Sequence, residues 1–165
     1  MTLSGGVAAH RWPAWVVLVA FFVGTFAAGA IGAVASLSAP RFYQALTLPP
    51  WAPAPGLFGP VWSLLYVLMA VAAYLAYRAG AGGAIFVYVA QLVLNAAWTW
   101  LFFALHSGAA ALVDIVVLLA LIVALIVMFW RVRPLAAALL APYACWVAFA
   151  TALTWTVWML NPGVL

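Results

Sequence analysis

The chain has 165 residues, of which 72% are hydrophobic and only 4% are charged, and its mean hydropathy is +1.32. Water-soluble domains are about one-quarter charged, so this composition excludes a soluble globular fold and predicts an integral membrane protein. The net charge of +4 comes from five scattered arginines and one acid. Because they form no basic patch, we expect no nucleic-acid partner.

Five apolar runs follow one another along the chain, and each is long enough to cross a bilayer as a helix of about 20 residues. The runs do not alternate between apolar and polar residues, as the strands of a membrane barrel would. We therefore predict an all-α membrane protein with a single domain over residues 1–165. The predicted transmembrane helices span residues 12–36, 59–77, 84–105, 109–130 and 135–160.

The first connection, residues 37–58, is much longer than the other three. It contains five prolines, too many for a continuous helix, together with large apolar side chains such as Tyr43 and Trp51. This composition favours a lid-like first loop that covers one end of the helix bundle. The alternative is a loop whose aromatic rings lie at the level of the lipid headgroups.

The arginines predict the orientation, because cytoplasmic loops of membrane proteins accumulate Lys and Arg. Arg11, Arg78, Arg131 and Arg133 fall on one side of a five-helix topology, and Arg41 falls on the other. We expect the N-terminus in the cytoplasm and the long loop outside. The protein is then a multi-pass integral membrane protein of a bacterial cell membrane, or of the mitochondrial outer membrane if it is eukaryotic.

Polar side chains in apolar helices are candidates for function, because hydrocarbon does not solvate them. Along the third helix, spacings of three and four residues place five polar or aromatic side chains on one face. They are Tyr88, Gln91, Asn95, Trp98 and Phe102. Hydrogen bonding between helices and ligand binding explain the two amides equally well.

Two further aromatic faces are predicted on the second and fifth helices. Phe58, Trp62 and Tyr66 share a face of the second helix, and Trp146 and Ala150 share a face of the fifth. Each face alone is more often ordinary packing. Three such faces under an aromatic loop would enclose a pocket for a flat apolar ligand with a polar edge, such as a porphyrin or a sterol.

The chain offers little for acid–base or metal chemistry. Asp114 lies near the start of the fourth helix, where a structural role suffices. His10, His106 and Cys145 are scattered without metal-ligand spacing, so we expect no metal site, although His106 as an axial haem ligand stays open. No catalytic triad or glycine-rich phosphate loop can be assembled.

Longer motifs identify a family. They are Phe42-Tyr43-x-x-Leu46-x-x-Pro49-Pro50-Trp51-x-Pro53, Phe58-Gly59-Pro60-Val61-Trp62-x-x-Leu65-Tyr66 and Gln91-Leu92-x-x-Asn95-x-x-Trp98-x-x-x-Phe102-Phe103. In these motifs the chain resembles the TspO/MBR family of translocator proteins, also called peripheral-type benzodiazepine receptors. The resemblance implies five membrane helices, often in a homodimer, and a pocket capped by the first loop that binds protoporphyrin IX, haem, sterol-like lipids or synthetic drugs.

The resemblance also implies roles for particular residues. Trp51, Trp62, Asn95 and Trp146 match pocket positions, and Trp51 and Trp146 match a pair tied to light-dependent porphyrin breakdown. Together with the helix faces, the expected ligand-binding set is Tyr43, Trp51, Phe58, Trp62, Tyr66, Gln91, Asn95, Trp98, Trp146 and Ala150. Trp155 and Met159 stand where the family's sterol-recognition pattern has a tyrosine and a basic residue.

Three functions are compatible with these residues. The first is a membrane receptor or sensor that binds tetrapyrroles and regulates porphyrin metabolism or transport, with no cofactor required. The alternatives are an enzyme that degrades protoporphyrin in light, with Trp51 and Trp146 as its catalytic residues, and a porphyrin or sterol transporter. We favour the non-enzymatic function and leave the enzyme open.

Small residues recur along two helices and predict close helix packing. The first helix carries Gly24, Ala28 and Gly32, and the third carries Ala90, Ala97 and Ala104. Because the family resemblance implies a dimer through the third helix, we assign the small residues of the first helix to packing inside the bundle. The expected partners are a second copy of the chain, membrane lipids and porphyrin or sterol-like small molecules.

Overall fold

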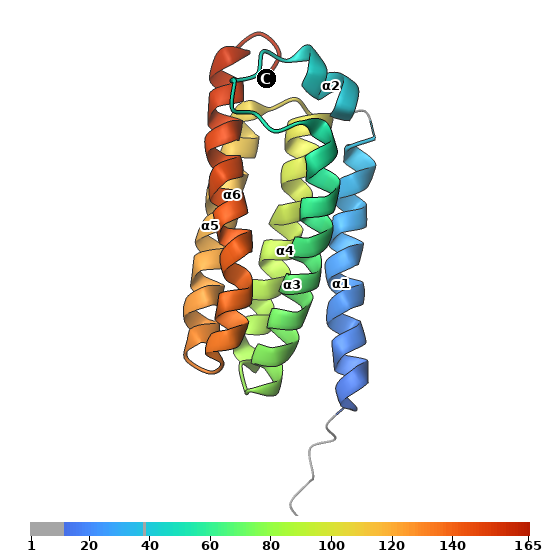
Figure 1. The fold of residues 1–165 in the computed structure, drawn as a ribbon, viewed down its shortest axis with the longest axis vertical. Coiled ribbons are helices and arrows are strands. Elements are labelled where there is room, and N and C mark those ends of the chain that lie inside the picture. The colour runs from blue at the N-terminus through green and yellow to red at the C-terminus, as the bar shows by residue number, and fades with distance from the viewer. Residues whose placement is uncertain (1–11, 38) are drawn as a thin grey trace, which may run out of the picture.

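A computed structural model of the chain describes residues 12–37 and 39–165 (Figure 1). Arg11 and His10, which entered the predictions of orientation and metal binding, lie outside the described residues. The long helices are α1 (Ala14–Ala35), α3 (Phe58–Arg78), α4 (Ile85–Thr99), α5 (Gly108–Trp130) and α6 (Pro134–Leu160). The short ones are α2 (Ala39–Ala45), η1 (Pro55–Leu57), η2 (Gly82–Ala84) and the π-helical turn η3 (Trp100–Ala104).

Five segments are long and apolar enough to cross a membrane, and they confirm the predicted all-α membrane fold. Their ends follow local chemistry. Pro134 opens α6, where its missing N–H would have no partner in any case, and Gly80, with φ of 101°, closes α3 in a conformation that favours glycine. Because such signals are local, the predicted ends agree with the observed ends to within two residues when η3 is counted as the last turn of the third transmembrane helix.

The five long helices form a ring, in which neighbouring helices are not always consecutive in the chain. Going round the ring, α1 packs against α3, α3 against α6, α6 against α5, α5 against α4, and α4 against α1. The short turns correctly predicted α4–α5 and α5–α6 as neighbours, but α3 and α4 barely contact each other. Since α1 packs against both, it separates them, and this arrangement leaves a cavity at each end of α1.

The packed core lies on the side of the ring away from α1. Tyr143, Met69, Leu118 and Ile122 are among its fully buried side chains, and they come from α6, α3 and α5. In α1, by contrast, only Thr25, Gly32 and Ala35 are buried. Helix α1 therefore presents most of its surface outward, as expected for a helix in contact with lipid.

The predicted third helix ends in a π-helical turn that its sequence does not reveal. In the turn η3, Phe102 is buried in a small cluster with Leu46 and Leu153, while its neighbour Phe103 lines a cavity. The π-helical turn therefore places two consecutive aromatic side chains in two different environments. His106 follows it with φ of 49°, and its ring stacks on Phe42 at 4.1 Å between centroids.

The small residues of α1 have different surroundings, which corrects the assignment of all three to packing. A Cβ added at Gly32 would lie 3.1 Å from Thr99 Oγ1 and 3.7 Å from the Cα of Ala96, so Gly32 packs against α4 as expected. A Cβ added at Gly24 would meet nothing within 4 Å, so that part of the assignment is wrong. Gly24 instead faces a groove.

We expect Gly32→Leu to destabilise the protein by about 2 kcal/mol, the usual cost of overpacking a tight contact. Thermal unfolding in detergent, followed by circular dichroism, measures the effect. Gly24→Ala is the matched control, and it should raise the unfolding temperature slightly because alanine favours helix over glycine. An unchanged unfolding temperature for Gly32→Leu would contradict the close contact between α1 and α4.

The outer face of α4 carries the predicted dimer seam. Ala90 and Ala104 are exposed and Ala97 is half-buried, so all three positions retain surface available to another chain. The homodimer through this face stays a prediction.

Candidate functional site

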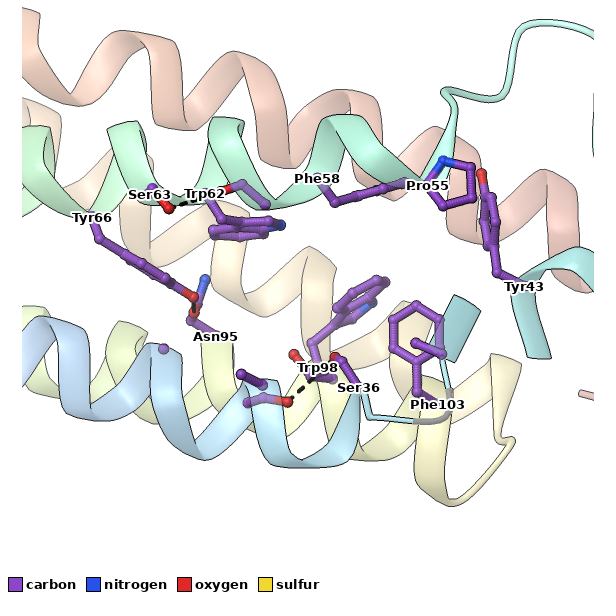
Figure 2. A pocket seen from close by; sticks show the side chains of 16 residues that line it. Ser36, Tyr43, Pro55, Phe58, Trp62, Ser63, Tyr66, Asn95, Trp98 and Phe103 are labelled. Carbon is purple, nitrogen blue, oxygen red and sulfur yellow. Dashed lines mark hydrogen bonds between the residues drawn. The ribbon is translucent and has the colours of Figure 1, made fainter. Parts of the chain in front are cut away.

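A cavity of about 390 Å³ lies between α1, α3 and α4, at the end of the bundle that carries α2 and η1 (Figure 2). Its size is within the usual range for small-molecule pockets. Its lining is Gly29, Gly32, Ala33, Ser36, Ala39, Tyr43, Pro55, Phe58, Gly59, Trp62, Ser63, Tyr66, Asn95, Trp98, Thr99 and Phe103. None of these residues is charged, so a ligand would meet apolar walls, hydroxyls and one amide.

Six residues of the expected ligand-binding set line this cavity: Tyr43, Phe58, Trp62, Tyr66, Asn95 and Trp98. The structure places the other four elsewhere. Trp146 and Ala150 line a separate void of about 20 Å³, which Phe58, Trp62, Asn95 and Trp98 also border. Gln91 is buried in the bundle, and Trp51 is half-exposed and packs against Phe149 of α6.

A chain of hydrogen bonds joins three helices at the inner end of the cavity. The Tyr66 hydroxyl donates to Asn95 Oδ1 at 3.0 Å, and Asn95 Nδ2 donates to the Tyr143 hydroxyl at 3.1 Å. Tyr143 in turn donates to Gln91 Oε1 at 2.9 Å. Both amides of α4 therefore form hydrogen bonds to side chains of other helices. Of the two, only Asn95 also faces the cavity.

Asn95 has capacity left for a ligand. An Asn side chain offers two N–H donors and an oxygen with two lone pairs, and the two bonds above use one donor and one lone pair. Reversing both amides would reverse the direction of the chain, but it would use the same one donor and one lone pair of Asn95. One N–H and one lone pair remain.

The cavity walls are aromatic. Trp62 lies 5.4 Å from Tyr66 between ring centroids, and Trp98 stacks on Phe102 at 5.4 Å. Figure 2 shows Trp62 and Trp98 on opposite sides of the cavity, from α3 and α4. The indole Nε1 of Trp98 is buried and has no hydrogen-bond partner among the described residues, so it is a donor without an acceptor.

Two glycines of α1 make room for these rings. A Cβ added at Gly29 would collide with the Tyr66 ring, and one added at Gly32 would press on Thr99. Ser36 and Ser63 also reach the cavity, but each hydroxyl donates to the carbonyl four residues earlier in the chain. Helix α1 therefore forms a smooth wall that lets the aromatic side of the cavity approach it closely.

The segment between α1 and α3 contributes Ala39, Tyr43 and Pro55 to the lining of the cavity. Tyr43 is buried, and its hydroxyl donates to the Pro53 carbonyl at 3.4 Å. Burial raises the pKa of this hydroxyl above its ordinary value, so it stays protonated and remains a donor.

Asn161 fastens this segment to the end of α6. Its Oδ1 accepts from the Thr47 N–H at 2.8 Å, and its Nδ2 donates to the Thr47 carbonyl at 2.9 Å and to the Val157 carbonyl at 2.7 Å. Leu46 is buried beside this contact against Leu153 and Val157. The segment is thus anchored at one point beyond the cavity.

Aromatic rings connect the cavity with Trp51. Phe58, which lines the cavity, lies 6.0 Å from Trp146, and Trp146 lies 5.7 Å from Phe149. Phe149 lies 5.7 Å from Trp51, which is 47% exposed. The two tryptophans of the expected catalytic pair are therefore linked through one phenylalanine and do not touch the cavity together.

No charged side chain of the described residues lines the cavity. Asp114 is buried in α5, and its Oδ2 has no hydrogen-bond partner within the part of the chain that the structure describes. Across residues 12–37 and 39–165, no three His, Cys, Asp or Glu side chains come together as metal ligands.

A model of the TspO/MBR family matches residues 15–159 of the chain. The chain belongs to the TspO/MBR family. It is 39% identical to Tryptophan-rich protein TspO of Chlorobaculum tepidum over 144 residues, which cover 81% of this chain and 90% of that protein. The identity to Protein CrtK of Rhodobacter capsulatus is 36%, over 87% of this chain and 91% of that protein.

Animal members of the TspO/MBR family are similar to the chain as well. The human Translocator protein is 38% identical over 129 residues, which cover 74% of this chain and 76% of that protein. Family membership and the five apolar helices together establish a multi-pass integral membrane protein.

Sequence reasoning did not find the α1 side of this TspO/MBR cavity. Gly29, Gly32, Ala33 and Ser36 carry no distinctive chemistry, and of these four only Gly32 was singled out, as a residue of helix packing. Phe103 and Asn161 were missed for another reason, because the π turn and the contact with Thr47 depend on tertiary structure. The spacing of Gly29 and Gly32 opposite an aromatic helix face was the one available signal.

Proposed function

We propose that this protein is a membrane receptor that binds a tetrapyrrole such as protoporphyrin IX, or another flat apolar ligand, in the cavity between α1, α3 and α4. The observation that supports this most is the combination of facing indoles with an amide that keeps one free donor and one free acceptor. Aromatic faces attract a flat π system, and the amide recognises a polar edge. Binding would regulate porphyrin metabolism or transport.

The absence of charge from the lining supports a receptor over an acid–base enzyme. General acid–base catalysis needs a group that titrates near the working pH, and the sixteen lining residues include no Asp, Glu, His, Lys or Arg. We also propose that the segment over residues 39–57 acts as a lid, with Tyr43 and Pro55 moving when a ligand enters. Its anchor at Asn161 would serve as the fixed end of this motion.

Titration of the purified protein with protoporphyrin IX in darkness tests the receptor. We expect Trp62→Ala to weaken binding by at least about fivefold, because an aromatic contact contributes about 1 kcal/mol beyond its buried area. The matched control is Trp15→Ala, which removes an exposed indole that lines neither this cavity nor the void beside it. Equal affinities for the two variants would place the ligand elsewhere.

Light-dependent breakdown of protoporphyrin is a second candidate function, and the row of rings from Phe58 through Trp146 and Phe149 to Trp51 favours it. In this function the tryptophans serve as electron or radical partners of the excited porphyrin. We expect Trp51→Ala to leave the dark affinity within about twofold, because Trp51 lies outside the cavity, and to slow the loss of porphyrin absorbance in light.

Two results would change this view of Trp51. Bleaching at the wild-type rate in the Trp51→Ala variant would exclude Trp51 as an electron or radical partner. The receptor would then be the remaining proposed function. A large drop in dark affinity would instead place the indole against the macrocycle, as a closed lid requires.

A further inference from the structure

A second cavity, of about 420 Å³, lies along α1 at the end opposite the ligand cavity. It is an open groove bordered by α1, the end of α3 and the start of α4, at the end of the bundle that carries the α3–α4 and α5–α6 turns (Figure 1). Ala20 and Gly24 line it from α1, Tyr77 from α3 and Tyr88 from α4. The groove shares no residue with the ligand cavity.

The deep part of the groove offers only apolar surface. The Tyr88 hydroxyl is already paired with Thr25 Oγ1 at 2.6 Å, and Thr25 also donates to the Phe21 carbonyl at 2.6 Å. The remaining lining is mostly aliphatic or aromatic. Because the polar groups at its floor are satisfied, the groove favours an occupant without hydrogen-bonding groups at that depth.

The length of the groove matches one leaflet of a bilayer. From the start of α1 at Ala14 to Gly24 the helix rises about 15 Å at 1.5 Å per residue. Half of a hydrocarbon core of about 30 Å is also about 15 Å. The groove therefore runs from the membrane surface to the middle of the bilayer, the depth that an acyl chain occupies.

The end of the bundle at which the groove opens is basic. The Tyr77 hydroxyl has no hydrogen-bond partner among the described residues, and Arg78, the next residue, is exposed. Arg131 and Arg133 are exposed at the same end of the bundle. The only acid in the chain, Asp114, lies near the opposite end of α5, so the protein does not neutralise these arginines itself.

We propose that this groove binds one acyl chain of an anionic phospholipid, with its phosphate held at the mouth by Arg78 and Tyr77. The apolar walls select the chain, and the unneutralised arginines select a negative headgroup. The site is separate from the ligand cavity, and the proposal does not rest on the proposed function.

Native mass spectrometry of the detergent-purified protein tests the proposal by counting retained lipid. The protein is incubated with phosphatidylglycerol or with phosphatidylcholine of the same acyl chains. We expect one retained phosphatidylglycerol, favoured about fivefold over phosphatidylcholine, which corresponds to one basic group near an anionic lipid. Arg78→Gln should abolish this preference, whereas Arg41→Gln, at the opposite end, should not.

Filling the groove should release both lipids. Gly24→Leu and Ala20→Phe each place a side chain in the groove, and Gly24 has open space around it, so the fold should persist. Ala30→Leu is the control, since Ala30 is exposed on the same helix and lines neither the groove nor the ligand cavity. An unchanged thermal unfolding temperature of Gly24→Leu verifies folding independently.

Three results would overturn the proposal. One is equal retention of the two lipids by the wild type. Another is retention that survives both Gly24→Leu and Ala20→Phe. The third is a dimer that dissociates on Gly24→Leu with no change in bound lipid, since a second copy of the chain would then fill the groove.

Discussion

Replacing Asn95 with leucine should lower both the stability of the protein and its affinity for protoporphyrin IX. The substitution leaves the Tyr66 hydroxyl without its acceptor and removes the N–H donor to the Tyr143 hydroxyl. Hydrogen bonds between membrane helices are worth about 0.6 to 2 kcal/mol each, so we expect a loss of about 2 kcal/mol. Loss of the free amide donor and acceptor should weaken ligand binding by about tenfold.

Gln91→Leu separates the two roles of the amides. It breaks the same chain of hydrogen bonds at Tyr143, but Gln91 is 1% exposed and does not line the cavity. We expect a similar loss of stability with unchanged affinity, measured by thermal unfolding and by titration in darkness. If Asn95→Leu destabilised the protein but bound the ligand normally, Asn95 would only join the helices.

The features that could be predicted from the sequence are those that depend on neighbours along the chain. Each apolar run with its flanking breaker determines one membrane helix, and spacings of three and four placed Tyr88, Gln91, Asn95 and Trp98 on one face of α4. The structure confirms the helices, and it joins Gln91 and Asn95 to one hydrogen-bonded chain. A helix face requires no knowledge of the other helices.

The features that could not be predicted depend on the order of helices around the ring. Trp146 was expected in the cavity, yet it borders a separate void because α1, rather than α6, closes the cavity opposite Trp62 and Trp98. The hydrogen bonds between Asn161 and Thr47 join residues 114 positions apart in the sequence, and no local sequence pattern predicts them. The ring brings together helices that are not consecutive in the chain, such as α1 with α4 and α3 with α6, and no local pattern reports such contacts.

Gly29→Leu should have the largest effect on ligand binding, because the added side chain enters the cavity itself. Gly29 faces the cavity beside the Tyr66 ring, and even a Cβ at this position would collide with that ring. Tyr66 would have to turn away from Asn95 and into space that a ligand needs. We expect the dark affinity for protoporphyrin IX to fall at least about a hundredfold, which corresponds to about 2.7 kcal/mol.

Gly24→Leu is the matched control for this variant, since it makes the same change in the same helix where a Cβ meets nothing. It should retain the wild-type affinity, because Gly24 faces the other groove. The two variants should also differ in their free energy of unfolding. Overpacking at Gly29 should cost about 1 to 3 kcal/mol, offset in part by the gain of helix propensity. Since Gly29→Leu would still leave most of the bundle intact, a folded variant that binds porphyrin normally would show that the ligand lies outside this cavity.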